Sequence, residues 1–247
     1  MITTYAVLSD IHGNSWALDA VLKDIGNRGI KNIFNLGDIL YGPLDPRGTF
    51  NLLQDLPIIS VSGNQDRMLL EQQDDEDPNP TLKYMLNELN DEHLQWIEKL
   101  PATEQIDDLF FLCHGTPKKD DAYLLEYVEQ NTVKFKSQQE LEQMVGSLPV
   151  EVILCGHSHV PNSALLPNGK LILNAGSVGL PAYIDDLPEV HNMETGSPFA
   201  CYTIIERAKD VWKFQIIKLP YNWHEAADAA KKNGRSDWAY WLKTGRA

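Results

Sequence analysis

Short apolar runs recur along the chain, and glycine and polar residues follow each of them at once. The runs lie within residues 4–9, 32–36, 58–62, 109–113, 151–155 and 170–174. Runs of this length that are rich in β-branched and apolar residues and end in such loops are typical of buried strands. We therefore expect six strands, each leading into a polar loop.

Helical periodicity separates the first strands. Residues 15–29, SWALDAVLKDIGNRG, place apolar side chains at i, i+3, i+4 and i+7 and end in glycine, as an amphipathic helix does. Similar patterns predict helix over roughly 80–99, 121–130 and 138–146. The alternation of strand and helix predicts an α/β fold with right-handed crossovers.

Turn signals between apolar runs change the pattern later in the chain. They predict a turn or hairpin around the Asp107–Asp108 pair and further hairpins over 163–174 and 199–219. Residues 222–247 predict two helices broken at Asn233–Gly234. Because no repeat or linker interrupts these elements, we expect one domain over residues 1–247, with 222–247 as its helical C-terminal segment.

Composition narrows the class of protein. The chain has 247 residues, 43% hydrophobic and 23% charged, and a net charge of −14, which is ordinary for a globular protein apart from its acidity. The acidity argues against a nucleic-acid partner. No apolar stretch is long enough to span a membrane, and no leader is evident, so we expect a cytoplasmic protein. Three cysteines without CxxC spacing indicate neither a disulfide framework nor a structural zinc site.

Potential metal ligands follow the expected strands. They are Asp10, His12, Asp38, Asn64, His114, His157 and His159. In α/β sheets the loops at the carboxyl ends of strands form ligand sites, and this set of oxygen and nitrogen donors suits Mn²⁺, Fe, Zn²⁺ or Co²⁺. The set is too large for one catalytic ion with an open position but sufficient for two ions that share a carboxylate, an arrangement used in phosphoryl transfer.

The blocks DIH, GD, GNQD, HG and GHSH, in this order within residues 10–159, resemble the signature blocks of the calcineurin-like metallophosphoesterase superfamily. The later LNAGSVGLP resembles a loop of its small, single-domain prokaryotic branch. The resemblance implies a four-layer αββα sandwich with two mixed β-sheets. It also implies two divalent ions, with Mn²⁺ favoured and Fe, Zn²⁺, Co²⁺ or Ni²⁺ as alternatives.

The resemblance also implies a role for each ligand. One ion would be held by Asp10, His12 and His159, the other by Asn64, His114 and His157, with Asp38 bridging them. We expect Asp38, Asn64 and His114 to act in catalysis as well. Residues 157–159 would then adopt an extended or turn conformation. The implied reaction is in-line attack on phosphorus by a hydroxide that bridges the two ions.

Two positions depart from the better-known members of that superfamily. Gln65 stands where many carry a histidine that can protonate the leaving group, and Tyr41 stands where many carry the aspartate that orients it. A neutral amide cannot act as a general acid. We therefore expect a small phosphorylated substrate with a good leaving group, and a preference for phosphodiesters over alkyl monoesters.

Alternative interpretations stay open. The substrate could be a phosphoprotein, as for a protein serine/threonine phosphatase, or a dinucleoside polyphosphate; a non-catalytic scaffold on the same fold is less favoured, because all the ligands are present.

Arg47, Lys118 and Lys119 could contact phosphate or be solvated, and Asn14 and Asp66 are expected to cap helices. We expect the histidines outside the blocks not to bind metal; they are His93, His191 and His224. The aromatic stripe Trp223, Trp238, Tyr240 and Trp241 is expected in the core, or in a homo-oligomer contact where exposed.

Overall fold

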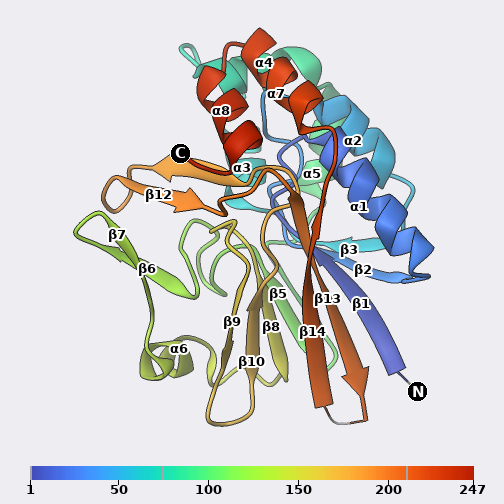
Figure 1. Cartoon of the computed structure of the whole chain (residues 1–247), viewed down its shortest axis with the longest axis vertical. Helices are drawn as coiled ribbons and strands as arrows, with labels where there is room; N and C mark the ends of the chain where they lie inside the picture. Colours follow the sequence, from blue (N-terminus) through green and yellow to red (C-terminus); the bar gives the residue numbers. More distant parts are fainter. Residues whose placement is uncertain (1, 74, 210) are drawn as a thin grey trace.

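Two five-stranded sheets stack face to face in the computed structural model, which describes residues 2–73, 75–209 and 211–247 (Figure 1). The first sheet has the order β14-β13-β1-β2-β3. Its strands are β1 (Ile2–Leu8), β2 (Asn32–Asn35), β3 (Ile58–Ser60), β13 (Ala200–Ala208) and β14 (Val211–Leu219). β1, β2 and β3 are parallel, whereas β13 runs antiparallel to β1 and β14 antiparallel to β13. The sheet is therefore mixed, as expected.

The second sheet is also mixed and has the order β4-β5-β8-β10-β9. Its strands are β4 (Thr103–Ile106), β5 (Phe110–Cys113), β8 (Val152–Cys155), β9 (Asn162–Leu165) and β10 (Leu171–Asn174). The three central strands are parallel, and an antiparallel strand flanks them on each side. All six expected strands are present, and so are the hairpins predicted near 107, over 163–174 and over 199–219.

Helices complete four layers. The helices α1 (Ser15–Asn27), α2 (Pro46–Leu53), α3 (Asn64–Glu71), α4 (Pro80–Glu88) and α5 (Asp91–Glu98) contribute apolar side chains to one core with the first sheet. A second core lies between the sheets. In a third, α6 (Gln138–Val145) packs on the outer face of the second sheet. The predicted αββα sandwich with two mixed sheets is confirmed.

The C-terminal segment forms the predicted helix pair, α7 (Trp223–Lys232) and α8 (Ser236–Thr244). The chain turns at Gly234, whose φ of 83° suits glycine. The pair packs around Trp238 and Trp241 against Leu44 and Leu180. These two tryptophans are buried, which confirms the core interpretation for them, whereas Tyr240 is 53% exposed.

Two local predictions need correction. The region 80–99 is two helices rather than one, because Leu89 is extended and Asn90 caps the second helix. The helix predicted over 121–130 is wrong: a hairpin forms there, with strands β6 (Glu126–Glu129) and β7 (Thr132–Phe135). Left-handed Gln130 and Asn131 make its turn, and a neighbouring hairpin of β11 (Ala182–Asp185) and β12 (His191–Glu194) contacts β7. Pairing and packing therefore overrode the local periodicity.

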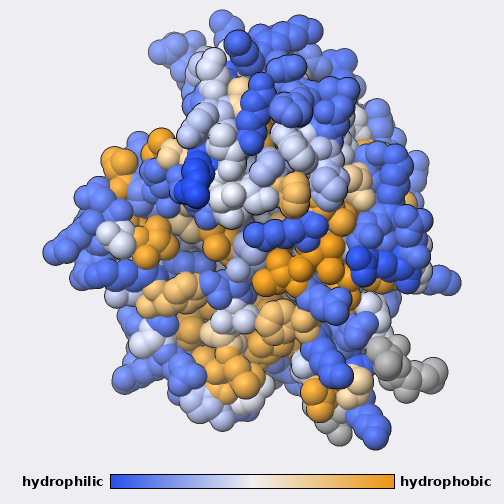
Figure 2. Space-filling view, viewed as in Figure 1, coloured by the Kyte–Doolittle hydropathy of each residue, from blue (hydrophilic) through white to orange (hydrophobic). Residues whose placement is uncertain are grey.

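The exposed surface is partly apolar. Figure 2 shows hydrophobic side chains gathered over the strands that face the viewer in Figure 1, among them β9, β10 and β14. Val211, Phe214 and Ile216 of the outer strand β14 are among the exposed residues. Among the described residues, no helix has both the length and the apolar character needed to cross a membrane.

Candidate metal centre

The predicted ligands converge on one buried site. They come from the loops after β1, β2, β5 and β8 and from the first residue of α3. All are buried except Asn64, which is partly exposed. Strands from both sheets thus deliver them to one end of the sandwich, as expected for residues that follow the carboxyl ends of strands.

Most of the ligand positions share an unusual backbone conformation. The left-handed residues are Asp10, His12, Asp38, His157 and His159, with φ between 52° and 67°. This conformation costs an ordinary residue roughly 1–2 kcal/mol. Hydrogen bonds between the loops stabilise it: the backbone N–H of His12 donates to the Asp38 carbonyl at 2.9 Å, and that of Asp10 donates to the Gly37 carbonyl at 3.0 Å. Residues 157–159 therefore form a turn, one of the two conformations expected.

One group of potential ligands comprises Asp10, His12 and His159. The Nδ1 atoms of His12 and His159 lie 3.0 and 2.6 Å from the backbone carbonyls of Tyr41 and Leu180. A carbonyl only accepts, so each Nδ1 carries the hydrogen and each Nε2 presents a lone pair when the ring is neutral. The two Nε2 atoms are 3.0 Å apart, and a cation between them would relieve the repulsion of these lone pairs. The same ring tautomer is usual for metal-bound histidine.

A second group comprises Asp10, Asp38 and His114. His114 donates through Nδ1 to the Leu36 carbonyl at 2.7 Å, so its Nε2 also faces the site. This Nε2 lies 3.0 Å from Asn64 Oδ1 and 3.4 Å from Asp38 Oδ2. Oxygen and nitrogen lone pairs thus converge here as in the first group.

The predicted pairing of the histidines in GHSH matches their surroundings. The ring centroid of His157 lies 5.2 Å from that of His114, and the centroid of His159 lies 4.8 Å from that of His12. Asp38 Oδ2 reaches both groups, at 3.9 Å from His12 Nε2 and 3.4 Å from His114 Nε2. Asp10 also belongs to both groups, which the sequence did not anticipate. The assignment of each residue to one ion, with Asp38 as the bridge, stays a prediction.

Burial and close charges shift the pKa values in the site. Burial lowers the pKa of His12 and of His157 to about 4, reinforced by the neighbouring histidines. Burial also lowers the pKa of His114, but the carboxylates of Asp38 and Asp10 outweigh it and raise the value to about 10. The nearby histidines lower the pKa of Asp10 against the opposing effect of burial. The carboxylates thus attract positive charge, which a divalent cation can supply in place of protons.

The surroundings of Asp10 Oδ1 show whether these residues suit a cation. Asp10 Oδ1 is buried and accepts no hydrogen bond within the described ranges, although buried carboxylate oxygens normally have partners. It lies 3.2 Å from His159 Nε2 and 3.8 Å from His114 Nε2. A carboxylate oxygen placed between imidazole nitrogens in this way is a suitable ligand for a divalent metal.

Hydrogen bonds from side chains fix the loops around the site. Asn174 Nδ2 donates to the Gly156 carbonyl at 2.7 Å, and Ser177 Oγ donates to the Asp10 carbonyl at 2.8 Å. Asn14 caps α1 by accepting from the Ala17 N–H at 3.1 Å. Asp66 accepts from the Gly63 N–H at 2.9 Å at the start of α3. The expected capping roles of Asn14 and Asp66 are confirmed.

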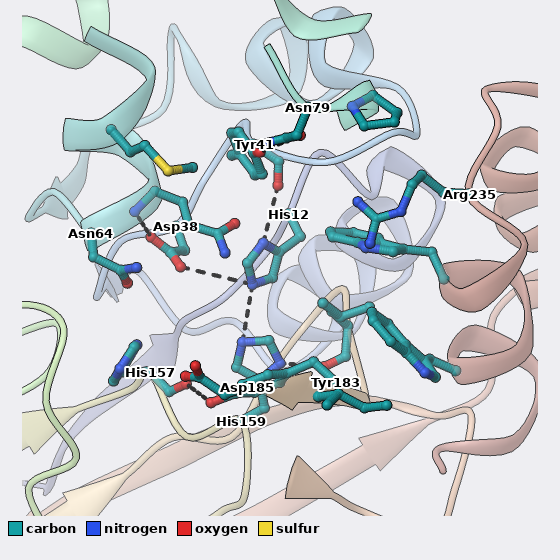
Figure 3. Close-up of a pocket in the computed structure, with 17 residues that line it drawn as sticks. His12, Asp38, Tyr41, Asn64, Asn79, His157, His159, Tyr183, Asp185 and Arg235 are labelled. Atoms are coloured by element: carbon teal, nitrogen blue, oxygen red, sulfur yellow. Dashed lines mark hydrogen bonds and ion pairs between the residues drawn. The ribbon is translucent and has the colours of Figure 1, made fainter. Parts of the chain in front are cut away.

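A cavity of about 480 Å³ opens over the ligand residues. Its lining includes His12, Asp38, Asn64, His157 and His159, and also Arg235, Trp238 and Trp241 of the C-terminal segment. Figure 3 shows Arg235 on the side of the cavity opposite Asn64 and His157. Its size falls in the range for small-molecule sites. Arg47 pairs with Glu88 Oε2 at 3.4 Å and does not line the cavity, and Lys118 lines a different one.

Known proteins share this sequence pattern and architecture. The profile of the "Calcineurin-like phosphoesterase superfamily domain" matches residues 4–194. The chain belongs to the calcineurin-like phosphoesterase superfamily. An uncharacterized protein of Methanocaldococcus jannaschii, MJ0912, is 31% identical to it, with 94% of each chain covered.

Among solved structures, this calcineurin-like phosphoesterase is similar to a metallophosphoesterase from Sphaerobacter thermophilus. That chain has a TM-score of 0.76 and 25% identity, with 99% of this chain and 100% of the other covered. The hypothetical protein PH1004 from Pyrococcus horikoshii shares the fold, with a TM-score of 0.72, 21% identity and 98% of each chain covered. The implied family is thus confirmed over the length of the chain.

The two departures from the superfamily pattern lie beside the potential metal ligands. Gln65 and Tyr41 both line the cavity. The Tyr41 hydroxyl donates to Asn79 Oδ1 at 3.3 Å, and burial raises its pKa. Gln65 Oε1 accepts no hydrogen bond from any described residue. Neither side chain loses a proton easily near neutral pH.

The sequence did not predict a network of two tyrosines and a histidine that contacts the histidine loop. Tyr183 donates to the His157 carbonyl at 2.9 Å, and its hydroxyl lies 2.9 Å from that of Tyr123. The Tyr123 hydroxyl lies 2.8 Å from His191 Nε2. His191 thus belongs to this network rather than to either group of potential ligands. No motif marks these residues, and they come from segments where no hairpin was predicted.

Proposed function

We propose that this calcineurin-like phosphoesterase is a dinuclear-metal enzyme that hydrolyses small phosphodiesters with good leaving groups. One observation carries the proposal: two groups of lone-pair donors adjoin each other through Asp10 and Asp38 at the base of one cavity. When bound, two divalent ions supply a nucleophilic hydroxide near neutral pH and neutralise charge on the phosphoryl oxygens.

The protein's own groups keep the ligands in position. The backbone N–H of Gln65 donates to Asp38 Oδ1 at 2.9 Å, so the other oxygen of Asp38 stays directed toward His114. Backbone carbonyls fix the rings of His12, His114 and His159. Such contacts behind the predicted ligands limit how far these side chains must move when metal ions bind.

The surroundings of the leaving group support the preference for diesters. A general acid contributes about 10²–10⁴-fold in rate, and Gln65 stands where that acid would be. When this protonation is absent, the rate of hydrolysis falls least for esters whose leaving group is an acidic alcohol. The aromatic walls of the cavity, which include Tyr183, Trp238 and Trp241, favour a small organic substrate over a phosphoprotein.

Metal analysis and two substrates test the proposal. Protein purified without added metal should contain two divalent ions per chain. It should hydrolyse bis(p-nitrophenyl) phosphate faster than glycerol phosphate, an alkyl monoester. His114→Ala should reduce this activity by more than about tenfold, because even contacts behind a metal ligand are worth 10–100-fold.

The exposed His224 supplies the matched control. His224→Ala should keep both metal content and activity. Faster hydrolysis of the alkyl monoester would contradict the diester preference. A metal-free protein that is fully active, or full activity in His114→Ala, would reject the dinuclear mechanism.

A further inference from the structure

Arg235 stands out among the residues that line the cavity. Within the described residues, the lining includes the carboxylates of Asp38 and Asp185 but no other lysine or arginine. Arg235 lies in the turn between α7 and α8, and its side chain is 22% exposed. Figure 3 shows it across the cavity from Asn64 and His157. A single positive charge thus faces the site from the opposite wall.

Neighbouring side chains hold the guanidinium in place. Nε donates to Asp237 Oδ1 and Oδ2 at 2.9 and 3.2 Å, and Nη2 donates to Asp237 Oδ2 at 2.6 Å. Nη1 donates to Thr81 Oγ1. The guanidinium carbon also lies 5.5 Å from the centroid of the Trp238 ring. Arginine has five N–H groups, so these contacts leave one on Nη1 and one on Nη2. Such a pair can bind two oxygens of one phosphate.

The helix pair that carries Arg235 is fixed relative to the metal ligands. Asn233 Nδ2 donates to the Pro43 carbonyl at 3.0 Å. The Trp238 ring, which contacts the guanidinium, lies 5.8 Å from the ring of His12. Trp238 thus contacts both the guanidinium and the ring of a predicted metal ligand. Because Arg235 lies across the cavity from Asn64 and His157 (Figure 3), an anion bound to it would be separate from a phosphate at the metals.

We propose that Arg235 binds a second phosphate of the substrate, separate from the phosphate that reacts. This inference rests on the proposed function and narrows its substrate class to phosphodiesters that also carry a distal phosphate. The apolar surfaces of Leu180, Trp238 and Trp241, which line the same cavity, suit the organic part of a nucleotide. Arginine recognises phosphate bidentately, whereas lysine acts as a point charge.

Two chromogenic substrates test this proposal, because the bond that is hydrolysed is the same in both. Thymidine 5′-(p-nitrophenyl phosphate) has no distal phosphate, and its 3′-phosphorylated derivative has one. The native enzyme should prefer the 3′-phosphorylated compound in kcat/KM by about tenfold or more, as expected for hydrogen bonds to a charged group. Arg235→Gln should remove the preference by slowing only the 3′-phosphorylated substrate.

Arg47→Gln is the matched control, because Arg47 is exposed and pairs with Glu88 away from the cavity. It should keep the preference. Arg235→Lys should keep only part of it, because the fork geometry is lost. Equal losses on both substrates in Arg235→Gln would show a merely structural role, and no preference in the native enzyme would also overturn the proposal.

A binding experiment separates this inference from the proposed function. Thymidine 3′,5′-bisphosphate should bind the native protein at least tenfold more tightly than Arg235→Gln in a calorimetric titration. If neither diester is hydrolysed but this difference is found, the proposed function fails and the role of Arg235 holds. If both diesters are hydrolysed and the difference is absent, the role of Arg235 fails alone.

Discussion

The carboxyl of Glu126 is buried directly behind the histidine loop. Ser158, between His157 and His159, donates to Glu126 Oε1 at 3.3 Å, and Glu126 Oε2 accepts no hydrogen bond from the described residues. Lys136 Nζ donates to the backbone carbonyls of Tyr123 and Glu126 rather than to this carboxylate. Burial raises the pKa of Glu126 to about 7, so the folded chain favours the neutral acid.

Glu126→Gln should make the protein less sensitive to alkaline pH. Because the pKa of Glu126 rises from 4.5 in the unfolded chain to about 7 on folding, the folded state binds more protons between these values. The contribution of the Glu126 carboxyl to the stability of the fold is complete below pH 4.5 and is lost as the pH rises through 7. Denaturant titrations should show Glu126→Gln gaining about 2–3 kcal/mol over the native protein between pH 5 and pH 8.

Exposed Glu142 provides the comparison for this measurement. Glu142→Gln should follow the pH dependence of the native protein. If Glu126→Gln also follows it, the carboxyl of Glu126 is not the source of the pH dependence.

At the scale of the element, the N-terminus of α1 connects the helix layer to the loops that carry the potential metal ligands. Asn14 accepts from the Ala17 N–H and donates through Nδ2 to the Gly179 carbonyl at 2.8 Å and to the Tyr221 hydroxyl at 3.1 Å. The backbone N–H of Gly179 donates to the Asp10 carbonyl at 3.0 Å. One side chain thus joins a helix cap to the loop beside a potential ligand.

Asn14→Ala should therefore affect both stability and activity. Loss of a cap costs about 1 kcal/mol, and the Gly179 carbonyl also loses a donor. We expect Tm to fall by roughly 4 °C or more and kcat/KM on bis(p-nitrophenyl) phosphate to fall as well. Ser137→Ala removes the cap of the distant α6 and should lower Tm without changing kcat/KM. Equal activity in the two variants would contradict the proposed link.

Local patterns predicted some elements and missed others for identifiable reasons. Strands such as β8 were predicted because buried parallel strands are continuous apolar runs. The hairpins β6–β7 and β11–β12 were not, since their residues are only partly buried and their pairing depends on distant neighbours. Tyr123 and Tyr183, which contact the histidine loop, were missed with them.

On the scale of the whole molecule, the cavity joins parts of the chain that are far apart in sequence. The convergence of the potential ligands was predictable because short motifs follow recognisable strands. The position of Arg235 in the cavity was not predictable, because nothing in its local sequence shows that α7 and α8 pack near His12. The two parts meet through the tertiary contacts of Trp238 and Trp241, which no local periodicity encodes.

Metal should stabilise the whole fold. A ligand at 100 times its Kd adds about 2.7 kcal/mol of stability, so saturating Mn²⁺ should raise the Tm of chelator-treated protein by roughly 5–10 °C. Differential scanning fluorimetry with and without EDTA measures the shift. His114→Ala should reduce it and exposed His224→Ala should not. An unchanged Tm for the native protein at saturating Mn²⁺ would contradict a metal site formed by these buried donors.

The left-handed backbone at Asp10, His12, Asp38, His157 and His159 also limits how this centre can be redesigned. Among residues other than glycine, asparagine, aspartate and histidine tolerate that conformation best. Glutamate and cysteine can ligate metals too, but they lack this tolerance. Exchange of these positions for a thiolate-rich or glutamate-rich centre would therefore require new loops. The types of side chain that these positions can carry are thus restricted by the main chain as well as by the chemistry of the site.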